Sequence, residues 1–126
     1  MGNPIDPAFL AKLRVLNEKY AASLPETLAA IASARALCAQ APSAPEHAKT
    51  LHQLLHTIAG SGATFGFAML GQQSRRIEQQ LRLLMKTEAR IEADWQQLFN
   101  ELDRFLAWAD RDPKANEYNI GDAQAD

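Results

Sequence analysis

Two histidines one helical turn apart are the residues of this chain best suited to chemistry near neutral pH. His52 and His56 are four residues apart in a segment of helical periodicity, and Gly60 follows His56 at the same spacing. At 100° per residue, His56 lies about 130° from the centre of the segment's apolar stripe, so we expect its imidazole to face solvent. A neutral imidazole with a free ring nitrogen is a nucleophile near pH 7.

Gly60 is unusual because a glycine on the surface of a helix weakens that helix. An interior helical glycine costs about 1 kcal/mol relative to alanine. Here the glycine removes a side chain one turn after His56 and on the same face. It leaves room for a group on the imidazole or for the backbone of a partner. We therefore predict a surface histidine that is kept accessible.

Five apolar stripes with helical spacing cover most of the chain, and no stretch alternates apolar and polar residues as a half-buried strand would. The stripes run from Phe9 to Tyr20, Leu24 to Cys38, Leu51 to Gly62, Phe67 to Leu84 and Ile91 to Ala109. We predict an all-α fold over residues 6–110, an antiparallel four-helix bundle preceded by a short N-terminal helix. Pro25 marks either a new helix start capped by Ser23 or a kink in one continuous helix.

The composition fits a single globular domain without a strong charge bias. The chain has 126 residues, 47% of them hydrophobic, and 13 basic against 15 acidic residues give a net charge of −2. This balance offers no bulk attraction for nucleic acid or an anionic membrane. A single cysteine and the lack of an apolar run of membrane-spanning length favour a soluble cytoplasmic protein.

Residues 111–126 are polar and acidic, typical of a tail or a linker, so we expect a monomer or part of a larger signalling protein.

The segment from Leu51 to Gly66 resembles the signature of histidine phosphotransfer (HPt) domains of bacterial two-component phosphorelays. In that signature a histidine is followed by any residue, an aliphatic residue, often a lysine, and then a glycine, a small residue and a second glycine. The matching residues here are His56, Ile58, Gly60, Ser61 and Gly62. The similarity covers about residues 6 to 110, including the pairs Ile77–Glu78 and Leu81–Arg82 and the upstream segment from Tyr20 to Leu28.

The resemblance implies a phosphocarrier without a nucleotide site of its own, and not an enzyme. His56 would accept a phosphoryl group through Nε2 from a receiver-domain aspartate and pass it to another receiver. Gly60 would keep the ring clear, and Glu78 would accept a hydrogen bond from Nδ1–H. The implied partners are receiver domains of response regulators or hybrid histidine kinases. No cofactor is expected on this chain, and Mg²⁺ is expected on the receiver only. The expected docking residues are Lys49, Gln53, Phe67, Arg75 and Arg82.

One departure from the signature keeps other functions open. Ala59 stands where many HPt domains have a lysine whose charge can steady the phosphoryl group. The nearby basic residues that can compensate are Arg75, Arg76, Arg82 and Lys49. A phosphorylation-inert helical adaptor that docks signalling proteins is one alternative. A transition-metal site built on His47, His52 and His56 is the other, and metal content would distinguish it.

Overall fold

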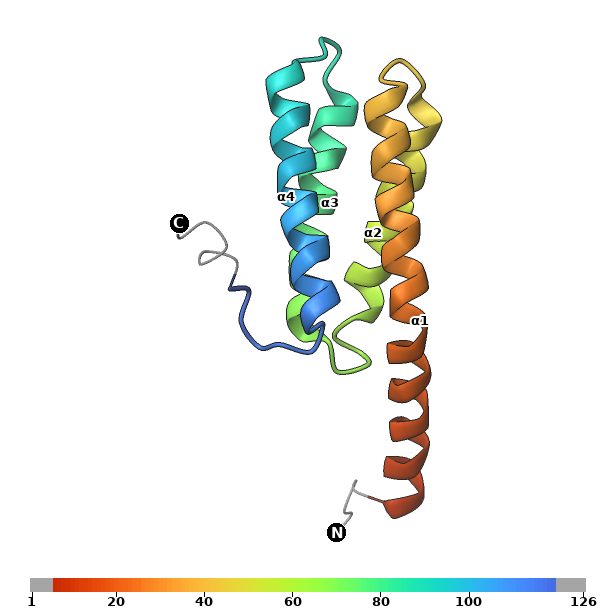
Figure 1. Ribbon diagram of the computed structural model, residues 1–126. Coiled ribbons are helices and arrows are strands. Elements are labelled where there is room, and N and C mark those ends of the chain that lie inside the picture. Colours follow the sequence, from red (N-terminus) through yellow and green to blue (C-terminus); the bar gives the residue numbers. More distant parts are fainter. Residues whose placement is uncertain (1–5, 120–126) are drawn as a thin grey trace.

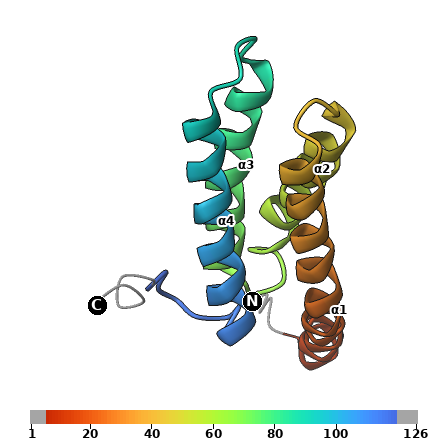
Figure 2. The same ribbon diagram turned by 45° about the horizontal axis from the view of Figure 1, so that its top comes forward.

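The computed structural model describes residues 6–119, which form four α-helices and no strands. The helices are α1 (Pro7–Gln40), α2 (Pro45–Ser61), α3 (Ala68–Lys86) and α4 (Glu92–Arg111). They form an antiparallel bundle in which α2 packs against α1 and α3, and α4 packs against α3 and α1 (Figures 1 and 2). No helix in this part of the chain is long and apolar enough to cross a membrane. The predicted all-α bundle is confirmed.

The segment from Phe9 to Tyr20, expected as a separate short helix, is instead the first part of α1. Figure 1 shows this part of α1 extending past the end of the bundle. Pro25 lies inside the helix and removes a single backbone donor. The carbonyl left without that donor belongs to Ala21, which is exposed, so water can bond to it. Leu24 is buried on the same turn, so packing continues through the proline and the helix does not restart.

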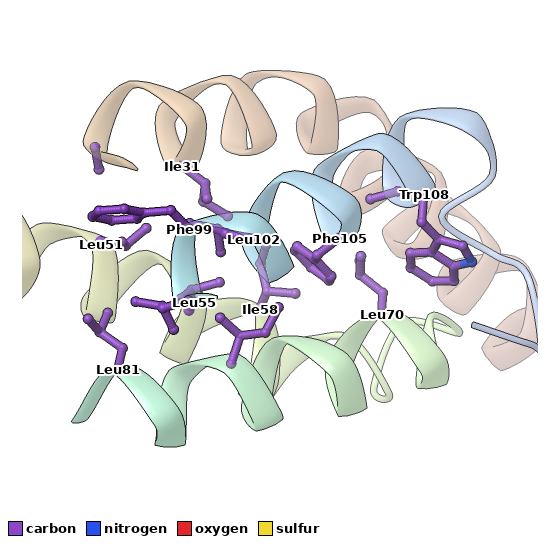
Figure 3. Close-up of a cluster of buried hydrophobic side chains, with 14 of the residues drawn as sticks. Ile31, Leu51, Leu55, Ile58, Leu70, Leu81, Phe99, Leu102, Phe105 and Trp108 are labelled. Atoms are coloured by element: carbon purple, nitrogen blue, oxygen red, sulfur yellow. The ribbon is translucent and has the colours of Figure 1, made fainter. Parts of the chain in front are cut away.

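All four helices contribute to one hydrophobic core. Figure 3 shows Ile31 of α1, Leu55 of α2, Leu81 of α3 and Leu102 of α4 directed into this core, and all four are fully buried. Complete burial of such a side chain stabilises a fold by about 1.5–3 kcal/mol. The core therefore determines the rotation of each helix about its axis, and with it the faces that remain outside.

Close contacts between α2 and α3 set the register of these two helices. A Cβ atom on Gly62 would lie 2.9 Å from backbone atoms of Gly71, so the two backbones meet where a side chain would not fit. Two turns further along α2 toward its N-terminus, the buried hydroxyl of Ser74 donates to the carbonyl of Leu55 at 2.8 Å. These contacts place Glu78, one turn after Ser74, level with the histidines of α2.

The C-terminal end of α2 is held on α1 by Tyr20. Its hydroxyl lies 2.8 Å from Oγ of Ser61, within hydrogen-bond distance. Its ring stacks on Phe65 with centroids 4.9 Å apart. Burial raises the pKa of Tyr20 above its ordinary value, while the hydrogen bond with Ser61 acts in the opposite direction. The turn that follows the histidine segment is thus attached to the first helix.

The chain returns to the bundle after α4. The indole nitrogen of Trp108 donates to the carbonyl of Glu117 at 2.9 Å, and the ring of Tyr118 packs edge-on against Trp108 at 5.2 Å. The segment expected as a polar tail, 111–126, therefore includes residues with tertiary contacts. Residues 120–126 of that segment lie outside the described part of the chain.

Candidate functional site

His56 lies on the outer face of α2, away from the core. Its side chain is 61% exposed, as its angle on the helix predicts. Gly60, one turn later, is also exposed, and a Cβ atom placed on it would meet nothing within 4 Å. The surface next to the imidazole is therefore open.

A buried carboxylate from the neighbouring helix lies behind His56. The side chain of Glu78 on α3 is only 3% exposed, and its Oε2 lies 3.5 Å from Nδ1 of His56. At that distance the contact is electrostatic and not a direct hydrogen bond. The same Oε2 accepts a hydrogen bond at 2.7 Å from Nη2 of Arg82, one turn further along α3. The register of α2 and α3 thus brings together the two residues that the resemblance had paired.

Glu78 is ionised at neutral pH in spite of its burial. Burial raises the pKa of the carboxyl group. The hydrogen bond from Arg82 and the positive charges of His52, Arg82 and His56 together lower it by more, so the pKa lies below its ordinary value. A buried carboxylate is stable only when such partners compensate its lost hydration. The site therefore keeps a negative charge on the Nδ1 side of the His56 ring.

His52 also belongs to this site, although the one specific role predicted for it from the sequence was as a ligand in the metal alternative. Its ring lies nearly parallel to that of His56, with centroids 6.1 Å apart and an interplanar angle of 12°. Its Nε2 lies 2.7 Å from Oε2 of Glu78, but the N–H bond does not point at that oxygen, so the contact is not an aligned hydrogen bond. The four-residue spacing was the available signal, because residues four apart share one face of a helix.

The arginines of α3 have different partners. Arg82 is bonded to Glu78, and Arg76 pairs with a carboxylate of α4 at 2.6 Å. Arg75 donates to the backbone carbonyl of Ala59 at 3.2 Å, and no carboxylate contact of Arg75 is found within residues 6–119. Ala59 itself is buried. A guanidinium group therefore lies beside the position where many HPt domains have a lysine.

Four of the five expected docking residues are exposed, and Phe67 is not. The exposed residues are Lys49, Gln53, Arg75 and Arg82. Phe67 is 1% exposed, and its ring packs against Tyr20. Its backbone N–H donates to the carbonyl of Gly62 at 2.7 Å, which turns the chain back into the bundle just before α3. The assignment of Phe67 to a docking surface is therefore wrong, because its side chain is part of the core.

The described part of the chain offers no arrangement of side chains that could hold a metal ion. Within residues 6–119, no group of three or more His, Cys, Asp or Glu side chains is placed to hold a metal ion. The thiol of Cys38 is buried, which raises its pKa, while the charge of Arg90 acts in the opposite direction. The metal alternative therefore has no donor set in this region.

Comparison with known proteins identifies one relationship. The family described as Hpt domain matches residues 15–108, well over half of the chain. The matched range contains the whole of α2 and α3, and with them His56, Gly60 and Glu78. Neither a curated protein nor a solved structure matches the chain.

Proposed function

Because the chain belongs to the Hpt domain family, we propose that it is a phosphorelay intermediate that carries a phosphoryl group on His56. One observation carries this proposal. The imidazole is 61% exposed on an open helix face, and a buried, ionised carboxylate lies 3.5 Å behind its Nδ1 atom. A nucleophile with an accessible outer nitrogen and a fixed charge on its inner side suits transfer between proteins.

The reacting atom in this proposal is Nε2 of His56. Its lone pair forms the N–P bond while the bond between phosphorus and the aspartate oxygen of the receiver breaks. The electron pair of the broken bond stays on the receiver's carboxylate. Nδ1 keeps its proton, so the phosphorylated ring carries a positive charge, which the ionised Glu78 stabilises. The same carboxylate favours the tautomer that leaves Nε2 free to attack.

The partner in this proposal is a receiver domain of a response regulator or a hybrid histidine kinase. Phosphoryl transfer is catalysed mainly by positioning and by neutralisation of charge. The receiver's metal ion and lysine supply most of that neutralisation, and this chain supplies the nucleophile and a docking surface. Lys49 and Gln53 are exposed on α2, and Arg75 and Arg82 are exposed on α3, the two helices that form the site, which supports such a surface. The cytoplasm, where a single buried thiol stays reduced, is the compartment that fits this role.

A phosphorylation-inert adaptor is the second candidate function, and Ala59 favours it. An adaptor would keep the docking surface of a phosphocarrier without its chemistry. It would not depend on the imidazole, so His56→Gln would leave the binding of receivers and every downstream effect unchanged. The exposed His56 and the open position at Gly60 favour the phosphocarrier, because an adaptor gains nothing from a cleared histidine.

Transfer from a phosphorylated receiver tests the two functions directly. Receivers labelled on their aspartate are mixed with the wild-type protein and with His56→Gln. We expect label on the wild type alone, labile in acid and stable in base, as for a phosphohistidine. A folded wild-type protein that binds receivers but takes no label from a panel of them would establish the adaptor instead.

The docking surface has its own test. Alanine substitutions at Lys49 and Gln53 leave the core untouched because both side chains are exposed. We expect each to weaken the binding of the receiver that donates the label, without changing the melting temperature. Unchanged binding in both variants would show that the receiver docks elsewhere.

A further inference from the structure

Three basic side chains converge on one oxygen atom of the buried Glu78. Oε2 lies 2.7 Å from Nε2 of His52, 2.7 Å from Nη2 of Arg82 and 3.5 Å from Nδ1 of His56. The side chain of His52 is 24% exposed, so it lies deeper in the α2–α3 interface than His56. The two closest groups therefore hold the carboxylate, and the exposed histidine has the longest contact.

The short contact defines where His52 carries a proton. If Nε2 were unprotonated, two atoms of partial negative charge would lie 2.7 Å apart in a buried position, and they would repel each other. His52 must therefore be protonated at Nε2, as the Nε2–H tautomer or as the imidazolium. Arg82 donates to Oε2 at 2.7 Å, and Nε2 of His52 lies at the same distance without an aligned N–H, so these two groups occupy the close positions around this oxygen.

We infer that His52 competes with His56 for Oε2 of Glu78 and thereby sets how strongly Nδ1 of His56 retains its proton. His52 is a positioning residue in this arrangement, because it acts on the outer imidazole only through Glu78. Removing its N–H leaves the buried oxygen with Arg82 as its one short contact, and the nearest remaining donor is then Nδ1 of His56. The carboxylate will close on that donor and favour the tautomer with a free Nε2.

The consequence for phosphotransfer rests on the function proposed above. A larger fraction of His56 with free Nε2 accepts a phosphoryl group faster. Phosphorylation in turn places a positive charge on the His56 ring and draws Glu78 away from His52. His52 thus restrains the unphosphorylated nucleophile and gives up its contact once the phosphoryl group has arrived.

The tautomer ratio of His56 tests the competition without any phosphotransfer. The ratio is measured from ¹⁵N chemical shifts of the imidazole at pH 8.5, where imidazoles are neutral. Relative to the wild type, we expect His52→Leu to raise the ratio of the Nδ1–H to the Nε2–H form about two- to tenfold, the range of one hydrogen bond. His52→Gln, whose amide can still reach Glu78, should keep the wild-type ratio. An unchanged ratio in His52→Leu would overturn the inference.

If His52→Leu does not fold, a second pair of variants tests the same inference. His52→Asn is polar but too short to place a donor at the position of Nε2, so it should behave as the leucine variant does, with His52→Gln again as its control. The transfer assay then separates the two proposals. A shifted ratio in a protein that accepts no phosphoryl group supports the competition and contradicts the relay. An unshifted ratio in a protein that does accept one contradicts the competition alone.

Discussion

The carboxylate of Glu78, which is almost completely buried, lies 3.5 Å from Nδ1 of His56, which is largely exposed. An acid on one helix thus faces the inner nitrogen of a base on the next helix, while the outer nitrogen of that base faces open surface. The two ring nitrogens of His56 are therefore in different environments. Nδ1 faces the negative charge of Glu78, and Nε2 is available to a partner.

Replacing Glu78 by glutamine tests the role of that charge in phosphotransfer. We expect Glu78→Gln to lower the initial rate of phosphoryl acceptance about tenfold, because the positive charge that forms on the His56 ring loses a nearby opposite charge, an effect of about one pKa unit. Quenched-flow measurement of label on His56 gives the rate. Gln79→Glu adds a carboxylate at a neighbouring exposed position and serves as the control, with no rate change expected. A Glu78→Gln rate equal to wild type would contradict this role.

Stability should depend on pH through Glu78. The folded pKa of this carboxyl group lies below its unfolded value, so its contribution is complete above the unfolded pKa, about 4.3 for glutamate, and disappears as the pH falls through the folded pKa. We expect the wild type to exceed Glu78→Gln in free energy of unfolding at pH 7 and to lose this advantage below about pH 4. Urea titrations across this range measure it. A difference independent of pH would mean that the carboxylate's charge is not involved.

The two glycines that flank the end of α2 should respond oppositely to alanine. Gly60→Ala adds a methyl group into open space and should stabilise the protein by about 0.5–1 kcal/mol, the usual helical cost of glycine. Gly62→Ala places a Cβ atom 2.9 Å from the backbone of Gly71 and should destabilise it by about 1–3 kcal/mol, as overpacking does. Thermal unfolding compares the two. Equal effects would contradict the close approach of α2 and α3.

A bulky residue at position 60 should separate folding from transfer. A Cβ atom at position 60 meets nothing within 4 Å, and leucine favours the helix more than glycine does, so the melting temperature of Gly60→Leu should not fall. The side chain will stand beside His56 on the same face, and we expect phosphoryl acceptance to fall at least tenfold because a receiver can no longer approach the ring closely. Acceptance at the rate of Gly60→Ala would show that this face does not meet the receiver.

The lysine that many HPt domains have at position 59 can be restored. Ala59→Lys should lengthen the lifetime of the phosphohistidine, since a cation near the phosphoryl group offsets its negative charge. Ala59→Met is the control of similar length without charge, because the native side chain is buried and either substitution disturbs packing. Decay of acid-labile label after removal of the receiver gives the lifetime. Equal lifetimes in the two variants would show that Arg75, bonded to the carbonyl of residue 59, already supplies the cation.

Much of the fold follows from local signals in the sequence. Helical periodicity identifies the stripes that become α2, α3 and α4. Asp6, directly before Pro7, caps the start of α1 by accepting the backbone N–H of Ala8 at 3.3 Å, which is also a local feature. The continuity of α1 through Pro25 was left open at that level. Burial of Leu24 beside the proline decided it, because packing outweighs one missing hydrogen bond.

Some features of the site also follow from the sequence of one helix, and others depend on how two helices pack. The outward direction of His56 and the position of Gly60 beside it are angles on a single helix, so residue spacing alone determined them. The approach of Glu78 to His52 and His56 depends on the register between two helices. That register is set by the Gly62–Gly71 contact, and it cannot be predicted from the spacing of apolar residues within either helix.

Phe67 shows most clearly where prediction from the sequence fails. It begins an apolar stripe and was also expected on the docking surface near His56, but the turn directs its ring into the core. The sequence by itself therefore determined which residues share a helix face, because that follows from 3.6 residues per turn. Only the tertiary structure decided which faces meet and which carboxylate the histidines share, because those depend on packing between distant segments.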